Sequence, residues 1–336
     1  MNKDNSISSI PPVVSVIIPI YNTEIFLRDA LDSICNQTLQ ELEIILINDG
    51  STDGCQSIIE EYALKDIRIQ WYMQYNQGQA VARNNGLLFA KGKYIYFMDS
   101  DDILDTNALQ QCYQVCEQNE LDSSIFDAEA FIDNCKVPDT YNYNRKGIIN
   151  EDRLWNGLEL LNYELEHYIF FASPCLFFTK RAFLKNKFEG FPSGIIHEDH
   201  AFAMQIMLNA QRIRYIAQPY FKRRVRANST MTATFGMRNI EGYTTVCTRI
   251  RSWAQFHEEY SSINNYLTQT LNAVIWEGHK MTLLEKIETL CRFRRLKLSK
   301  YITFRSWMVF WFYTFYRPVV HFRNQGAYFR KNQKMA

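Results

Sequence analysis

The sequence predicts an α/β fold in which a mostly parallel, doubly wound sheet carries helices on both faces. Between residues 13 and 98, short apolar runs rich in β-branched residues alternate with longer segments of helical periodicity. Nearly continuous apolar runs are typical of strands that are buried on both faces. Strands that alternate with helices at this spacing form βαβ units, whose strands lie parallel.

The N-terminal part of the chain shows this alternation most clearly, and turn or capping residues bound each element. The expected elements, in chain order, are a strand over 13–20, a helix over 24–37, a strand over 43–48, a helix from Thr52 or Asp53 to Leu64, a strand over 67–72, a helix over 79–90 and a strand over 93–98.

The remainder of the chain is less regular. The expected elements are strands over 123–132, 174–179 and 213–225, a helix over 201–208 and a helical region over 236–290. We therefore divide the chain into a flexible leader over 1–12, a domain over 13–232 and a C-terminal region over 233–336.

Composition and charge limit the class of protein. Hydrophobic residues make up 47 % and charged residues 22 % of the chain, which argues against a disordered protein. The net charge of +1 conceals an asymmetry, because eleven basic residues and no acidic ones follow Glu288. A basic end on an acidic body points to an anionic surface, for which phospholipid and nucleic acid are the two candidates.

The cysteines and the N-terminus indicate a reducing compartment. Eight cysteines are scattered without a CxxC pair, and the first twelve residues lack the apolar stretch of a signal peptide. No window of about 18 uncharged apolar residues suggests a membrane-spanning helix. We therefore expect a cytoplasmic location.

Polar side chains follow three of the expected parallel strands. Asn22 and Glu24 come after the first strand, Asp49 after the second, and Asp99 and Asp101 after the fourth. Ligands bind at the carboxyl ends of the strands in such sheets, so these groups mark a candidate site. Each group alone is also compatible with an ordinary turn or helix cap. Their clustering at three strand ends favours a site.

Asp99 and Asp101 form a candidate site for a divalent cation. Two carboxylates that are two residues apart, just past a strand, can both face Mg²⁺ or Mn²⁺, which take oxygen ligands and bridge phosphates. A solvated turn that caps a helix near Leu104 is the alternative interpretation.

Basic residues near the strand ends are candidates for binding phosphate. Gly78 opens the expected helix over 79–90, and free amides at a helix start favour anions. Arg83 lies one turn inside this helix. It either reaches a phosphate, holds Asp99 in place, or is an ordinary surface arginine. A basic strand later in the chain either clamps a diphosphate or is a solvated edge. Its members are Arg223, Arg224 and Arg226.

A second acidic pair, Glu198 and Asp199, follows a glycine-containing stretch and precedes the helix over 201–208. A carboxylate here is suited to take a proton from an incoming hydroxyl group. Capping of the helix is the alternative. A metal site built on His197 and His200 is disfavoured, because no cysteine or third histidine lies nearby in the sequence.

These residues together resemble the family-2 glycosyltransferases of bacterial capsule, O-antigen and lipooligosaccharide synthesis. The matching segments, within about residues 13–230, are VSVIIPIYNTEIFLRDALDSICNQTLQELEIILINDGSTDG, NQGQAVARNNGLLFAKGKYIYFMDSDD and HEDHAF. Their order and spacing are far more specific than any one segment. The resemblance implies a Rossmann-like GT-A fold, a nucleotide-sugar donor with a UDP-sugar as the expected one, and inversion at the anomeric carbon.

The resemblance also implies roles for individual residues. Residues 13–120 would form the nucleotide-sugar-binding half of the domain and 121–232 the acceptor half. Asp99 and Asp101 would hold Mg²⁺ or Mn²⁺, with Asp101 the more direct ligand. Asp199 would be the general base, with Glu198 as its rival. The residues expected to bind the donor are Pro19, Tyr21, Asn22, Glu24, Asp49, Asn76, Gly78, Arg83, Asp99 and Ser100.

The expected reaction is a single in-line displacement onto a hydroxyl group of a glycan or lipid-linked acceptor in surface polysaccharide synthesis. The segment 289–336 is basic and aromatic, which suits peripheral binding to the anionic inner face of the cell membrane. Packing of this segment on the catalytic domain is the alternative.

Two other classes remain as alternatives. A sugar-phosphate nucleotidyltransferase would carry a glycine-rich basic signature after the first strand, where this chain has PIYNTE. A non-enzymatic polyanion-binding protein would use the basic C-terminus. We do not expect nucleic acid as a partner, because the body is acidic and no recognisable nucleic-acid-binding module is present.

Overall fold

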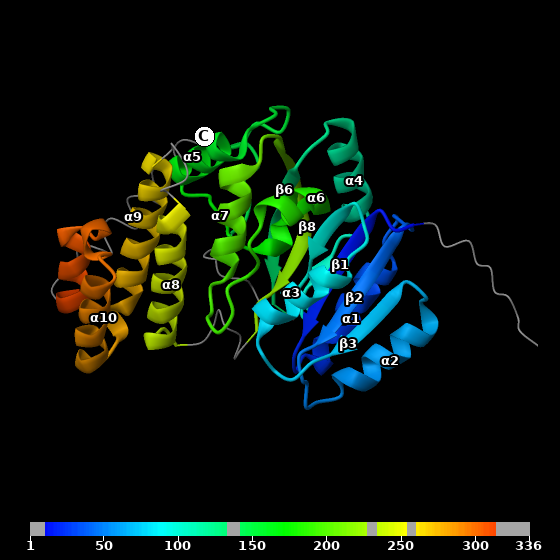
Figure 1. The fold of residues 1–336 in the computed structure, drawn as a ribbon, viewed down its shortest axis with the longest axis horizontal. Helices are drawn as coiled ribbons and strands as arrows, with labels where there is room; N and C mark the ends of the chain where they lie inside the picture. Colours follow the sequence, from blue (N-terminus) through cyan, green and yellow to red (C-terminus); the bar gives the residue numbers. More distant parts are fainter. Residues whose placement is uncertain (1–10, 133–141, 227–233, 254–259, 314–336) are drawn as a thin grey trace, which may run out of the picture. The chain divides into compact units, whose positions relative to one another are not determined.

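The computed structural model describes residues 11–132, 142–226, 234–253 and 260–313 (Figure 1). The chain divides into two compact units. One, which we call the sheet unit, comprises Met1–Gly194 and Glu198–Ala233. The other, which we call the helical unit, comprises Ile195–His197 and Thr234–Ala336. Most of the expected leader, residues 1–10, lies outside the described residues.

The sheet unit contains the predicted alternation of strands and helices, followed by a less regular half. Its elements in chain order are β1 (Val14–Ile20), α1 (Glu24–Cys35), β2 (Leu42–Asn48), α2 (Cys55–Lys65), β3 (Ile69–Met73), α3 (Gln79–Phe89), β4 (Tyr94–Phe97), β5 (Ile103–Leu104), α4 (Ala108–Gln118), β6 (Ser123–Phe131), α5 (Gly157–His167), η2 (Pro174–Leu176), β7 (Phe177–Lys180), α6 (Arg181–Lys187), α7 (Asp199–Asn209) and β8 (Ile213–Arg224).

Eight strands of the described residues form one sheet in the order β3-β2-β1-β4-β7-β6-β8-β5. β1, β2, β3 and β4 pair in parallel. The chain moves outward from β1 to β3 and then returns across β1 to β4. Right-handed crossovers therefore place α1 and α2 on one face of the sheet and α3 on the other. α1 packs against α2, and α3 packs against β1 and β2.

The second half of the sheet is mixed. β7 runs antiparallel to β4 and β6, and β5 runs antiparallel to β8, whereas β6 and β8 are parallel. Four of the seven pairings described are parallel, so the predicted α/β fold with a mostly parallel sheet is confirmed.

Several expectations about local structure need correction. The proposed helix near Leu104 is wrong, because Ile103–Leu104 forms β5 on β8 and α4 begins only at Ala108. Residues 174–176 of the expected strand form the 3-10 helix η2, and helices α5 and α6 had no counterpart among the expected elements. Helix α5 begins at Gly157, where a side chain would meet the Met207 carbonyl oxygen of α7 at 2.4 Å.

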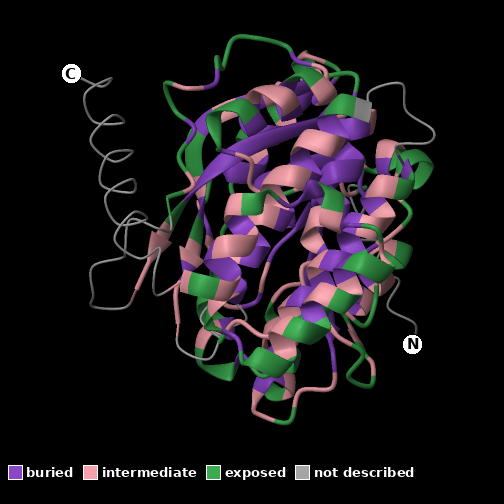
Figure 2. Cartoon of the chain, turned by 90° about the vertical axis from the view of Figure 1, so that its left-hand side faces the viewer, coloured by how far each residue is buried: buried purple, intermediate pink, exposed green. Residues whose placement is uncertain are grey.

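Burial explains the apolar runs. All seven residues of β1 and all seven of β2 are buried. Figure 2 shows buried residues along the strands, whereas the helices carry intermediate and exposed residues on one side. Full burial of each large aliphatic side chain contributes about 1.5–3 kcal/mol, so the central strands anchor the fold that presents the strand ends.

The helical unit is built from α8 (Met237–Trp253), α9 (Tyr260–Glu277), η3 (Gly278–Lys280), α10 (Leu283–Arg295) and η4 (Ser299–Tyr301), and residues 304–313 are also helical. α8 packs against α9 and α10. A capping box of Thr282 and Glu285 starts α10. The expected helical character of 236–290 is confirmed for its described residues.

The C-terminal segment packs within the helical unit as far as it is described. Val309 and Phe310 are buried, and a side chain at Gly278 would meet the Phe310 ring at 2.7 Å. Residues 314–336, which carry much of the basic and aromatic sequence, lie outside the described residues. In the described part of the chain, no helix combines the length and the apolar character needed to cross a bilayer.

Candidate active site

The carboxyl ends of β1, β2 and β4 meet at one edge of the sheet because these strands run parallel and in register. Ile20 lies opposite Asn48, and Ile17 lies opposite Phe97. The polar residues that follow each strand are therefore neighbours, as the sequence predicted.

Arg83 is the centre of the candidate site. Its side chain is fully buried on α3. Nη2 lies 2.7 Å from Asp99 Oδ1, and Nη1 lies 2.7 Å from Asp199 Oδ1 and 3.3 Å from Glu198 Oε1. A fully desolvated guanidinium is costly unless it is paired, and three carboxylates supply that pairing. The interpretation of Arg83 as a surface arginine is therefore wrong.

The position of Arg83 depends on the turn before α3. Gly78 has a φ of +89°, a backbone conformation that favours glycine, and this turn lets the chain enter the helix from the loop. Asp49 holds the same loop, because its carboxylate oxygens accept hydrogen bonds from the backbone N–H groups of Gln77 and Gly78. Asn84, the residue after Arg83, exchanges two hydrogen bonds of 2.8 Å with the backbone of Phe191.

The acidic pair begins α7. Asp199 is the first residue of the helix, and its side chain is 34 % exposed, compared with 8 % for Glu198. Burial raises the pKa of Glu198 to about 7, and the neighbouring Asp199 adds to the shift. Burial also raises the pKa of Asp199, and Arg83 opposes that shift. Asp199 is thus the more accessible of two coupled carboxylates.

The four residues 99–102, which follow β4 after Met98, make four different contacts. Asp99 Oδ1 accepts hydrogen bonds from Arg83 and Gln79, and Ser100 lies 2.9 Å from the Thr23 hydroxyl. Asp101 Oδ2 accepts a hydrogen bond from Arg226 at 2.7 Å.

Asp102, the fourth residue, has a different environment from the two carboxylates expected to bind metal. It is 3 % exposed and accepts a hydrogen bond of 2.6 Å from the Arg224 backbone N–H. Burial raises its pKa well above the ordinary range, and the charges of Asp101 and Asp99 add to this shift. Asp102 therefore ties the end of β8 to the strand-end cluster.

Asp99 and Asp101 fit a hard divalent cation that is shared with a ligand. Among the described residues, no group of three or more His, Cys, Asp or Glu side chains forms a complete metal site. Mg²⁺ at phosphate sites is, however, commonly held by one or two carboxylates, with phosphates and water as the other ligands. Gln79 and Arg83 both bind Oδ1 of Asp99, and Arg226 Nε binds Oδ2 of Asp101, so each contact engages one oxygen of its carboxylate.

The loops expected to line the nucleotide pocket are linked to each other. Asn22, at φ +51°, accepts a hydrogen bond from the Thr52 backbone through Oδ1. Glu24 accepts one from the Gly54 N–H, and its own N–H donates to Asp53. The loop after β1 is therefore braced by the loop after β2, and Asn22 and Glu24 serve at least as structural links.

The remaining predicted pocket residues differ in exposure. Tyr21 is 48 % exposed and Asn76 is also exposed, whereas Gly78 is half-buried. Pro19 instead lies buried within β1, opposite Ile47. It comes after the last residue of β1 that pairs with β4, so its missing N–H removes no hydrogen bond from that ladder.

The sequence did not identify several contacts of the site. Gln79 binds Asp99, and the Phe191 ring lies 5.3 Å from the Arg83 guanidinium. Of the basic strand, Arg224 pairs with Asp29 and Arg226 with Asp101. No sequence pattern marks these pairs, because their members are far apart in the chain.

Arg223 differs from the other two arginines of the basic strand, because it contacts a tyrosine. The Tyr143 hydroxyl accepts a hydrogen bond from Nη1 at 3.1 Å, and the Tyr143 ring lies 5.6 Å from the guanidinium. Burial lowers the pKa of Arg223, but the nearby Tyr143, Asp102 and Asp99 outweigh this effect and raise it above its ordinary value. Arg223 therefore lies in the field of the strand-end carboxylates.

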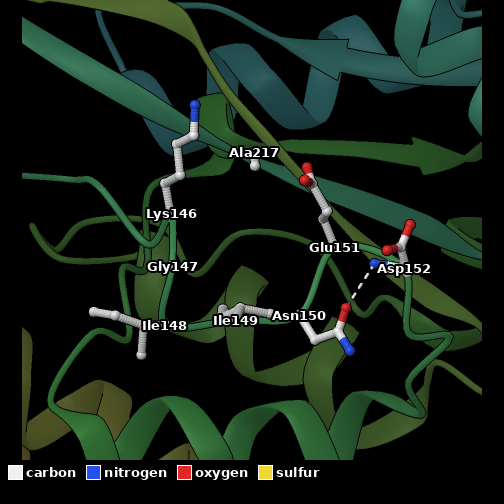
Figure 3. A pocket seen from close by; sticks show the side chains of 8 residues that line it. All are labelled: Lys146, Gly147, Ile148, Ile149, Asn150, Glu151, Asp152 and Ala217. Carbon is white, nitrogen blue, oxygen red and sulfur yellow. Dashed lines mark hydrogen bonds between the residues drawn. The ribbon is translucent and has the colours of Figure 1, made fainter.

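A separate cavity of about 310 Å³ lies away from these residues (Figure 3). Its lining consists of Lys146, Gly147, Ile148, Ile149, Asn150, Glu151, Asp152 and Ala217. None of the predicted site residues is among them, so the cavity does not mark the candidate active site.

Comparisons with known proteins agree with this geometry. The family described as "Glycosyl transferase family 2" matches residues 15–188. Glycosyltransferase GlyG of Streptococcus pneumoniae serotype 4 is 31 % identical over 237 residues, which cover 67 % of this chain and 75 % of GlyG. The chain spans only about a third of the length of several other curated relatives, namely 32 %, 29 % and 31 %.

Solved structures show the same fold. Residues 1-349 of S. aureus TarS in complex with UDP-GlcNAc give a TM-score of 0.69 at 21 % identity, over 86 % of this chain and 83 % of that chain. Mannosyltransferase PcManGT from Pyrobaculum calidifontis, in complex with GDP-Man and Mn²⁺, gives a TM-score of 0.53 at 17 % identity, over 89 % and 84 % of the two chains. These likenesses confirm the expected GT-A type of α/β fold.

Proposed function

The chain belongs to glycosyltransferase family 2, and we propose that it moves a sugar, with inversion, from a nucleotide-sugar to a hydroxyl group of a glycan or lipid-linked acceptor. The observation that carries this proposal is the ion-pair cluster in which Arg83 joins Asp99 to Asp199. This cluster brings Asp99, which is expected to bind the donor, and Asp199, the accessible candidate base, to the same guanidinium.

A UDP-sugar is the donor that we propose. TarS, which shares the fold, was solved with UDP-GlcNAc. The exposed Tyr21 is suited to stack on a base. Asn76 and Gly78 lie in the loop before α3, and the backbone N–H groups of the first turn of a helix favour phosphate. Asp49 is proposed to contact the base, although both of its oxygens already bind the loop before α3.

Asp199 is the proposed general base. Its carboxylate takes the proton of the acceptor hydroxyl while that oxygen attacks the anomeric carbon. The new carbon–oxygen bond forms as the bond to the nucleoside diphosphate breaks on the opposite side, which inverts the configuration. Arg83 holds Asp199 in place, and its positive charge opposes the rise in pKa that burial imposes.

Asp99 and Asp101 are the residues that would hold Mg²⁺ or Mn²⁺. The cation, when bound, supplies Lewis-acid neutralisation of the charge on the departing diphosphate. The presence of Mn²⁺ in the PcManGT complex supports this proposal. Arg223, which interacts electrostatically with Asp102 and Asp99, adds a positive charge near them.

Peripheral binding to an anionic membrane is the proposed role of one face of the helical unit. Three aliphatic residues, Leu283, Leu284 and Ile287, are exposed on the first turns of α10, and Phe304 is 80 % exposed. The eleven basic residues after Glu288 provide charge complementarity to an anionic leaflet. Such a contact would bring the enzyme to a lipid-linked acceptor in surface polysaccharide synthesis.

A donor screen tests the proposed function. The full chain is incubated with UDP-, GDP- and dTDP-sugars, with and without Mn²⁺, and released nucleoside diphosphate is measured. Release from a nucleotide-sugar with formation of a glycosylated acceptor is the expected result. A parallel incubation with nucleoside triphosphates and sugar phosphates tests the alternative, because release of pyrophosphate from the triphosphate would identify a nucleotidyltransferase.

A further inference from the structure

The three residues before the acidic pair belong to a different unit from the pair itself. Ile195–His197 group with the helices after Thr234, whereas Gly194 and Glu198 belong to the sheet unit. We call Ile195–His197 the strap. Because the strap is bonded directly to Glu198, whatever fixes the strap also constrains how the chain enters α7.

The backbone of the strap passes very close to Gly242 on α8. A Cβ atom at this position would lie 2.3 Å from the Ile196 carbonyl oxygen and 3.2 Å from its carbonyl carbon. Backbone atoms cannot rotate away as the end of a flexible side chain can. Glycine inside a helix costs about 1 kcal/mol relative to alanine, so α8 gives up stability at a position where only glycine leaves room for the strap.

Tyr243 and Asn239 hold the strap on the same face of α8. The Tyr243 ring stacks on the His197 ring with centroids 3.8 Å apart and planes 20° apart. Asn239 Nδ2 lies 3.2 Å from His197 Nε2. Residues three and four apart project from one side of a helix. Asn239, Gly242 and Tyr243 therefore form one continuous surface that contacts the strap.

The hydrogen bonds of Asn239 define the state of His197. Asn239 Oδ1 accepts a hydrogen bond from the Gly236 N–H, which leaves its Nδ2 to donate to His197 Nε2. His197 is then a neutral ring with Nε2 as acceptor. Burial lowers the pKa of His197 to about 4, and the charge of Arg238 adds to this effect, so the neutral ring persists at neutral pH.

His197 also adopts an unusual backbone conformation. Its φ is +70°, in the left-handed region that residues other than glycine seldom occupy. Such a conformation persists only where surrounding contacts enforce it, and strained residues of this kind cluster at functional sites. The ring stack and the hydrogen bond to Asn239 are contacts of that kind, and the next residue caps α7.

We propose that Gly242 and Tyr243 are positioning residues for the acidic pair. By fixing the strap they set the direction in which the chain enters α7, and with it the place of the Asp199 carboxylate beside Arg83. This inference rests on the proposed role of Asp199 as the general base.

Alanine substitutions at two glycines form a matched pair. Gly242→Ala introduces a conflict with Ile196, whereas the Cβ of Gly236→Ala meets no atom closer than 3.8 Å. We expect Gly242→Ala to lower kcat by about tenfold to a hundredfold, as misplacement of a catalytic group does. Nucleotide affinity, measured by calorimetry, should be the same in both variants, because the donor loops are untouched. Equal kcat in the two variants would overturn the proposal.

Tyr243 provides a second test in case Gly242→Ala does not fold. Tyr243→Phe retains a ring for His197 and should keep kcat near that of the parent, whereas Tyr243→Leu should lower kcat without changing nucleotide affinity. Loss of kcat in both variants, or in neither, contradicts a role for the stack.

Amide hydrogen exchange separates failure of this inference from failure of the proposed function. In Tyr243→Leu the amides of residues 195–199 should exchange faster than in Tyr243→Phe, whatever the enzyme transfers. If the parent transfers no sugar but exchange rises as expected, the strap is held as inferred and the proposed function is at fault. Unchanged exchange overturns the inference itself.

Discussion

Arg83 Nη1 lies 2.7 Å from Asp199 Oδ1, although 116 positions separate the two residues in the sequence. The same guanidinium holds Asp99, so one buried positive charge links the loop after β4 with the first residue of α7. Both the stability of the site and its chemistry should depend on this link.

Replacement of Arg83 by methionine should strongly destabilise the protein. The change leaves three carboxylates without their buried counter-charge, and breaking such a pair costs about 3–5 kcal/mol. Urea unfolding of Arg83→Met at neutral pH measures the loss. The loss should shrink as the pH falls, because protonated carboxyl groups no longer need the guanidinium. The exposed arginine of α1 is the control, and Arg28→Met should change the free energy of unfolding little.

Asp199→Asn should abolish transfer while leaving nucleotide affinity nearly unchanged. General bases contribute about 10²–10⁴ in rate, and the amide cannot accept the proton. Turnover and titration calorimetry on the same preparation make the comparison. The less exposed neighbour is the matched control, since Glu198→Gln should retain most of the turnover. The opposite pattern would move the role of base to Glu198.

The two carboxylates of the pair should also shape the pH profile. Burial raises the pKa of both Glu198 and Asp199, so turnover should fall with decreasing pH through an apparent pKa above about 3.9, the ordinary value for aspartate. That value belongs to the coupled pair. Glu198→Gln removes one negative charge and should therefore lower the apparent pKa of the turnover profile. An apparent pKa that is the same in the variant and the parent would argue against coupling.

Asp101→Asn should weaken dependence on Mn²⁺. The substitution removes one charged oxygen ligand and should raise the Mn²⁺ concentration needed for half-maximal activity by at least about tenfold, as is typical when a metal site is disturbed. Titration of Mn²⁺ into chelator-treated enzyme measures this. Asp152, whose side chain is 90 % exposed beside the separate cavity, supplies the control variant Asp152→Asn. Activity that survives chelation unchanged would contradict metal use.

Glu164 should make stability depend on pH. It is fully buried on α5 with its Oε1 2.8 Å from Arg145 Nε, yet burial still raises its pKa to about 7. An acid whose pKa is higher in the folded state contributes stability below its unfolded value, and that contribution is lost as the pH rises toward 7. Relative to the parent, Glu164→Gln should therefore gain up to about 1.4 kcal/mol per pH unit across this window. Denaturant unfolding between pH 5 and 7.5 measures the trend, and the exposed Glu166→Gln on the same helix should follow the parent.

The exposed face of α10 should govern binding to anionic vesicles. The double variant Leu284→Gln with Ile287→Gln should reduce flotation with phosphatidylglycerol-containing liposomes without loss of folding, because both side chains are exposed. Leu64→Gln, at an equally exposed leucine of α2, should float like the parent. A truncation at residue 290 would be a poorer test, since it removes the buried Phe293 and Phe310.

Much of the sheet edge was predictable from local sequence. The apolar runs of β1, β2 and β4 indicate buried parallel strands, and parallel strands bring their carboxyl ends together. The sequence alone therefore places Asp49 and Asp99 near one another. The helix after Gly78 also begins where its glycine predicts.

The second half of the sheet was harder to predict. β7 runs antiparallel between β4 and β6, and β5 is only two residues long. Short strands with irregular connections carry little periodicity, so Ile103–Leu104 resembled the start of a helix rather than an edge strand. The pairing of β5 with β8 is a long-range contact that no local pattern specifies.

The sequence by itself determined the alternating elements, the motif residues at three strand ends and the asymmetric charge of the chain, because each depends on neighbours within a few positions. Only the tertiary structure decided that Arg83 is buried and which carboxylates it binds. An arginine on a helix has the same local pattern whether it faces water or three acids. The difference arises from desolvation, which depends on residues that approach from more than a hundred positions away.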